Sequence, residues 1–125
     1  MALGRIEITN ITKSAVLCPT ALQANTFVSR LRGVLGNEET YLASGLWLTP
    51  SSCVHTFGMQ NELDIVALDR DLRVIGLWES VGPGKVRGFS LRTKSVLELQ
   101  SGHARRCGLI VGDQLAVQPV AAKVN

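Results

Sequence analysis

The sequence predicts a mainly β fold, a compact single-domain antiparallel β-barrel or sandwich with two short helices. The chain has 125 residues, enough for one hydrophobic core, so residues 1–125 are expected to form one domain. Apolar residues make up 46% and charged residues 18%, a globular balance. Twelve glycines among many Val, Leu and Ile indicate short strands joined by tight turns. Because no regular helices separate the strands, a parallel α/β sheet is not expected.

The predicted strands are short apolar or alternating segments bounded by turn residues. Residues 63–68 are almost continuously apolar, which predicts a central strand buried on both faces. The turn residues 69–71 connect it to residues 73–78, and together these segments predict a β-hairpin. Pro19 and Pro50 are expected to end the strands that precede them. The full set of predicted strands covers residues 6–9, 14–18, 45–49, 54–59, 63–68, 73–78, 95–99 and 114–117.

Two short helices are predicted. Residues 25–33 begin with an Asn that can cap a helix and end with a Gly that can terminate one. A rival start lies at Thr20, where the Thr-x-x-Gln spacing resembles a capping box. Residues 101–107 predict the second helix, with Ser101 as its cap and Gly108 as its end.

Charge and cysteine usage restrict the protein class. The net charge of +3 is mild and does not require nucleic-acid binding. No segment approaches the roughly 20 apolar residues of a membrane span, and the first residues lack the apolar run of a signal peptide. Cys18, Cys53 and Cys107 are odd in number and widely spaced, which argues against a disulfide framework and a zinc site. A cytoplasmic protein without a membrane partner or a cofactor is therefore expected.

Residues 53–71 are the most informative part of the chain. If the first half is a strand, its side chains alternate, so Cys53, His55, Phe57 and Met59 face the same way. Cys, His and Met are ligands that a soft metal such as Cu(I) prefers. However, alternate residues lie about 6.5–7 Å apart along a strand, so these side chains are more readily explained as core packing. No metal site is predicted.

Four residues of this region form the candidate ligand-binding site: His55, Thr56, Met59 and Asp64. They are the polar and soft side chains that lie between apolar strands. Asp64 begins a buried strand, where a carboxylate must be paired or hydrogen-bonded, so it is either a site residue or a partner for backbone groups. The first hypothesis is a non-catalytic binding or accessory domain for an unknown small molecule or protein.

Two further hypotheses belong to other classes. A small hydrolase or transferase would use His55 with Cys53 or Asp64, although the sequence assigns no catalytic residue. Weak nucleic-acid binding would use a basic stripe that has only Phe89 as a nearby aromatic. The stripe consists of Lys85, Arg87, Arg92 and Lys94. Four charges are fewer than the roughly six to ten phosphate contacts of strong electrostatic binding, so a nucleic-acid partner is not expected.

Several short motifs occur together in a fixed order. They are Asn25-Thr-Phe-Val-Ser-Arg-Leu-Arg-Gly33, Gly45-Leu-Trp-Leu, Val54-His-Thr-Phe-Gly-Met59, Leu63-Asp64-Ile-Val-Ala-Leu-Asp69, Val96-Leu-Glu-Leu99, Gly102 and Gly112-Asp113. In order and spacing they resemble the family named domain of unknown function 192, over roughly residues 15–117. The resemblance implies one β-rich domain and supplies no function, because the family's name records that none was assigned.

Overall fold

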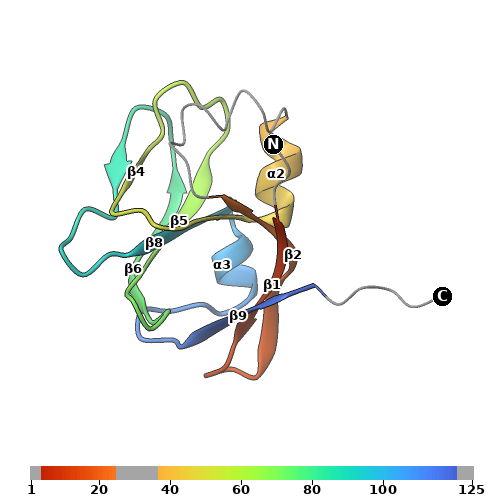
Figure 1. Ribbon diagram of the computed structural model, residues 1–125. Helices are drawn as coiled ribbons and strands as arrows, with labels where there is room; N and C mark the ends of the chain where they lie inside the picture. The colour runs from red at the N-terminus through yellow and green to blue at the C-terminus, as the bar shows by residue number, and fades with distance from the viewer. Residues whose placement is uncertain (1–3, 25–36, 121–125) are drawn as a thin grey trace.

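The computed structural model describes residues 4–24 and 37–120 and confirms the mainly β fold (Figure 1). Its strands are β1 (Gly4–Asn10), β2 (Ala15–Ala24), β3 (Leu46–Leu48), β4 (Val54–His55), β5 (Leu63–Leu68), β6 (Val74–Val81), β7 (Val86–Arg87), β8 (Ser95–Gln100) and β9 (Leu115–Pro119). The described helices are α2 (Glu38–Ser44) and α3 (His103–Arg106). Neither of these two helices has the length and apolar character needed to cross a membrane.

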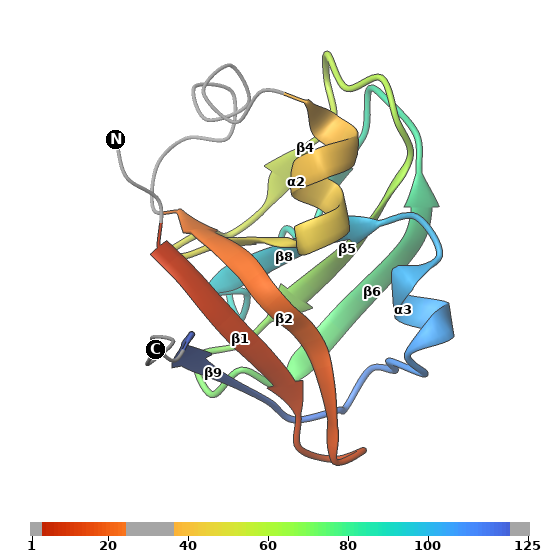
Figure 2. The same ribbon diagram turned by 90° about the vertical axis from the view of Figure 1, so that its right-hand side faces the viewer.

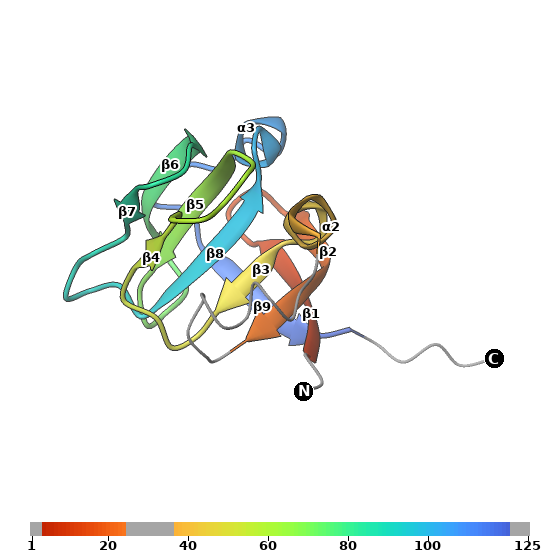
Figure 3. The same ribbon diagram turned by 90° about the horizontal axis from the view of Figure 1, so that it is seen from above.

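Seven strands form one curled sheet in the order β6-β5-β8-β3-β2-β1-β9, and β4 and β7 form a separate two-stranded ribbon. The pairings are antiparallel except for β2 with β3, which run parallel because the chain crosses over between them. The first and last strands of the order approach each other at one end, where Arg73 forms a bridge with Gln114 (Figures 2 and 3). The sheet is therefore curled toward a barrel without being closed. It is mixed rather than wholly antiparallel.

The core occupies both faces of the central strands. All six residues of β5 are buried, as predicted for a strand covered on both sides. Val66 packs with Leu97 in one apolar cluster, while Ile65 packs with Tyr41 of α2 in the other. β5 lies between β6 and β8 in the sheet, so its position is fixed by neighbours on both edges as well as by both clusters.

The predicted end of the second strand is wrong. β2 continues past Pro19 to Ala24, which also excludes a helix that starts at Thr20. Ile6 pairs with Ala21 of β2 and Ile8 with Cys18, a shift in register that leaves one extra residue in β2. Pro19 lies in this bulge, and a bulge tolerates proline because not every residue there has to donate to the ladder.

The helix predictions have three different outcomes. The helix predicted at residues 25–33 lies outside the described residues. The helix predicted at 101–107 is present as α3, but its cap is Gly102 with a left-handed φ of 89° rather than Ser101. Helix α2 was missed, although Asn37 caps it through its side chain, two glutamates occupy the first turn and Gly45 ends it.

Asp113 fixes the end of the sheet where β6 meets β9. Its buried carboxylate accepts hydrogen bonds from Asn10 Nδ2 at 2.9 Å, Lys13 Nζ at 2.9 Å and the backbone N–H of Ile110 at 3.0 Å. Burial opposes ionisation, but the hydrogen bonds from Lys13 and Asn10 outweigh it and lower the pKa of Asp113.

Replacing Asp113 by Asn is expected to lower the free energy of unfolding at pH 7 by about 1–3 kcal/mol, because a charge-assisted acceptor is lost. A folded-state pKa below the unfolded one stabilises the protein above roughly pH 4, and this contribution disappears as the pH falls through the folded value. Urea unfolding should therefore show the gap between wild type and variant narrowing in acid. A gap that is independent of pH would contradict this role.

Candidate functional site

The structure places three of the four predicted site residues in the interior. Thr56, Met59 and Asp64 are buried, while His55 is half-buried with its ring centroid 5.4 Å from that of Phe57. The strand ends at His55, so the expected alternation over residues 54–59 is wrong. A turn follows, in which the N–H of Met59 donates to the carbonyl of Thr56 at 3.1 Å. As a result Met59 enters the core, and Phe57 is 58% exposed.

Met59 has a packing role. Its Sδ accepts a hydrogen bond from the hydroxyl of Tyr41 at 3.4 Å inside the buried cluster beneath α2. This contact joins the turn after β4 to helix α2, which is a structural function for a flexible and polarisable side chain.

Thr56 holds the segment that follows β6. Its Oγ1 donates to the carbonyl of Gly82 at 2.7 Å and accepts from the N–H of Lys85 at 2.9 Å. The backbone N–H of Thr56 also donates to the carbonyl of Lys85 at 2.8 Å. Next to this anchor, β4 pairs with β7 through Val54 with Arg87. The segment after β6 is therefore hydrogen-bonded to residues 54–56.

Asp64 joins β5 to two other elements. Its Oδ1 accepts from the N–H of Ser80 at 2.8 Å, and its Oδ2 accepts from Gly102 at 3.1 Å and Ala104 at 3.0 Å. Ser80 has a φ of +51° and lies where β6 carries an extra residue relative to β5. The carboxylate thus stabilises a bulge in β6 and the start of α3, which is the backbone-partner role that the sequence left open.

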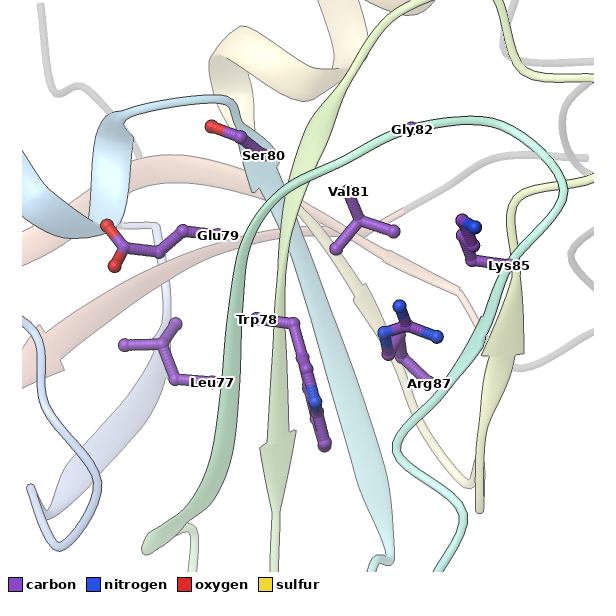
Figure 4. Close-up of a pocket in the computed structure, with 8 residues that line it drawn as sticks. All are labelled: Leu77, Trp78, Glu79, Ser80, Val81, Gly82, Lys85 and Arg87. Carbon is purple, nitrogen blue, oxygen red and sulfur yellow. The ribbon is translucent and has the colours of Figure 1, made fainter.

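An open cleft of about 410 Å³ lies between the edge of β6 and the segment that returns through β7 (Figure 4). Trp78 and Val81 project from β6 toward the side where Lys85 and Arg87 lie, and Leu77 and Glu79 project the other way. A Cβ placed on Gly76 would come within 2.5 Å of the Trp78 ring, so this ring lies directly over Gly76. The residues that line the cleft are Leu77, Trp78, Glu79, Ser80, Val81, Gly82, Lys85 and Arg87.

The cleft has an excess of positive charge. Arg87 uses its Nη1 to donate to the carbonyl of Val86 at 2.8 Å, and Lys85 is exposed. Glu79 is the acidic residue of the lining, and its charge is offset by Arg105, whose Nε lies 3.4 Å away. Two cations beside an indole ring can hold an anionic group on an apolar body.

The structure gives different evidence on the three alternatives, which are an enzyme that uses Asp64, a metal site and a nucleic-acid surface. Both oxygens of Asp64 are occupied by backbone N–H groups, so this carboxylate has a structural task already. Within residues 4–24 and 37–120, no three His, Cys, Asp or Glu side chains are grouped as a metal site. In the basic stripe, Phe89 is 82% exposed and Leu91 is 93% exposed, so an apolar tip lies beside Arg92 and Lys94.

Sequence reasoning missed the cleft itself. It identified Lys85 and Arg87 as part of a stripe and did not connect them with Trp78, because the connection depends on how the chain returns past β6. The available indication was a tryptophan near the end of an aliphatic strand, followed closely by Gly82, Gly84 and two basic residues.

The fold and the cleft define a small β-sheet domain with a cationic groove at one sheet edge. The chain belongs to the uncharacterised family named domain of unknown function 192, described as an uncharacterized ACR, which it matches over residues 8–117. No curated protein matches the chain.

Two solved structures share the fold. A protein of unknown function from Novosphingobium aromaticivorans has a TM-score of 0.67 and 20% identity, with 91% of this chain and 84% of that one covered. A protein from Sinorhizobium meliloti, proposed to be a transcription regulator, has a TM-score of 0.70 and 18% identity, with 93% and 94% covered. At these identities the likeness extends to the fold alone.

Proposed function

We propose that this protein is a non-catalytic binding domain that holds an anionic ligand in the cleft between β6 and β7. The observation that carries the proposal is the grouping of Trp78, Lys85 and Arg87 around one cleft. Thr56 and Asp64, two residues of the predicted site, position the wall of the cleft. They hydrogen-bond to the backbone of Gly82, Lys85 and Ser80 rather than to the ligand. A rigidly held wall reduces the entropy that is lost when a ligand binds.

The expected ligand combines a carboxylate or phosphate with an apolar portion. Lys85 and Arg87 supply charged donors for the anionic group, and the half-buried Trp78 and buried Val81 supply apolar surface. The charge of Glu79 does not oppose this, because Arg105 offsets it on the far side of β6. A neutral or cationic ligand would leave the two basic groups without an anionic partner in the cleft.

Proton–nitrogen NMR titration tests this function, with phenylacetate and inorganic phosphate as probes. Binding is expected to shift the Trp78 indole N–H and the amides of residues 80–87. The double variant K85E/R87E should weaken phenylacetate binding at least tenfold, because the loss of even one charge-assisted hydrogen bond removes about 1.5–3 kcal/mol.

The matched control is R92E/K94E, which changes the net charge equally at residues outside the cleft lining. It should retain binding. An equal loss in both double variants would mean general charge attraction instead of a site. If neither phenylacetate nor inorganic phosphate shifts these signals at millimolar concentration, the proposed function is contradicted.

A second candidate function, nucleic-acid binding, is favoured by the exposed tip. Phe89 is available for stacking beside Arg92 and Lys94, and one structural relative is described as a proposed transcription regulator. A single-stranded oligonucleotide added to the same samples separates the two functions. Nucleic-acid binding would shift Phe89 and be lost in R92E/K94E, with an affinity that falls steeply with salt.

A further inference from the structure

The cleft follows the backbone of β6. Six consecutive residues of the chain, 77–82, take part in its lining. Side chains of a strand alternate between two faces, so a pocket on one face would be lined by alternate residues. Lining by consecutive residues, including Leu77 and Glu79 that project away in Figure 4, means that the cleft runs along the strand's edge.

Among the residues that the structure describes, this edge of β6 has no strand partner beyond its first residue. β6 ends the strand order of the main sheet. Within residues 4–24 and 37–120, Val74 is the one residue of β6 that exchanges backbone hydrogen bonds on the outer side, donating to Asp113 at 2.9 Å and accepting from Gly112 at 2.8 Å. Beyond Val74, within the described residues, the outer edge carries no ladder. Unpaired N–H and C=O groups in a row are a template for another strand.

The returning segment does not fill this edge because its backbone is engaged elsewhere. Lys85 exchanges hydrogen bonds with Thr56 through both its N–H and its carbonyl, and Val86 pairs with His55. A chain that turns back after a strand usually pairs with it as a hairpin. Here the returning segment pairs with residues 54–56 instead of with β6. A space therefore remains between β6 and the segment that carries Lys85 and Arg87 (Figure 4).

We propose that the occupant of the cleft is an extended acidic peptide segment of a partner protein, which adds as a strand to the free edge of β6. The proposal rests on the function proposed above and specifies its ligand. Main-chain hydrogen bonds to β6 would supply affinity, and side chains at alternate positions would supply specificity. Acidic residues at one set of alternate positions would face Lys85 and Arg87 beside Trp78, and apolar residues at the other set would lie on the side to which Leu77 projects.

The test uses a capped peptide that alternates Val and Glu over about eight residues, long enough to span a typical strand. It is titrated into the full chain and followed by NMR. Copies that carry a single N-methyl group, moved one residue at a time, remove one backbone donor each. Strand addition predicts that methylation at every second residue weakens binding roughly tenfold, while methylation between these positions is tolerated.

Charge exchange gives the second arm. The K85E/R87E variant should lose the Glu peptide and bind a peptide with Lys in place of Glu, whereas R92E/K94E should behave as wild type. An N-methyl scan without a two-residue period would overturn strand addition. Binding of phenylacetate without binding of the peptide would overturn this inference and leave the proposed function standing, and failure of both probes would overturn both.

A second copy of the chain is the competing occupant. Edge pairing between copies would appear as β6 amide shifts that depend on protein concentration without peptide, together with a dimer in sedimentation. That outcome would also overturn the assignment to an acidic partner segment.

Discussion

Replacing Asp64 by Asn should lower the free energy of unfolding by about 2–4 kcal/mol. The carboxylate is fully buried and accepts three backbone N–H groups, from Ser80 on one oxygen and from Gly102 and Ala104 on the other. An amide has one acceptor oxygen, so in either orientation its NH₂ group faces at least one of these donors. Buried donors would then be left without partners, which is among the most costly changes in a folded protein.

The matched control is Asp69→Asn in the turn after the same strand. Oδ1 of Asp69 accepts hydrogen bonds from the N–H groups of Asp71 and Arg73 at 2.9 Å each. An Asn there keeps this oxygen, so its cost should stay below about 1 kcal/mol. Urea denaturation followed by circular dichroism measures both variants. Similar costs for the two would show that Asp64 does not hold β6 and α3 to β5.

Replacing Thr56 by Val should destabilise the protein by about 1–3 kcal/mol and also weaken binding in the cleft. The change keeps the side-chain volume but removes the hydroxyl that joins Gly82 to Lys85. Both backbone groups lose a partner, and the wall that carries Lys85 is no longer fixed. Denaturation and the phenylacetate titration measure the two effects on the same samples.

Two controls separate the stability effect from the binding effect. Thr56→Ser keeps the hydroxyl and should preserve most of the binding. Thr93→Val removes a different buried hydroxyl, which donates to the carbonyl of Gly88 at 2.6 Å, and leaves the hydrogen bonds of Thr56 to Gly82 and Lys85 in place. If Thr93→Val weakened binding as much as Thr56→Val, the effect would come from general destabilisation instead of from the anchor at Lys85.

The central part of the fold was predictable because its patterns are local and strong. The almost continuously apolar run of β5 and the turn after it predicted the hairpin with β6, and the alternation over residues 95–99 predicted the strand β8. Prediction failed where tertiary contacts override local preference. Pro19 lies inside β2 because it falls in a bulge of that strand, and residues 56–59 leave the strand direction where Thr56 binds Gly82 and Lys85.

The sequence by itself determined the fold class and the membership of the family, since these depend on composition, periodicity and motif order, and it drew attention to the region around Thr56 and Asp64. Only the tertiary structure decided what that region does. It showed that Thr56 and Asp64 use their polar atoms on backbone groups far along the chain. It also showed that the cleft belongs to Trp78 and its neighbours. The hydrogen bonds of Asp64 join residues that are 16 to 40 positions apart in the sequence, and such pairings produce no periodic pattern in it. This is the physical reason that the cleft was not predicted.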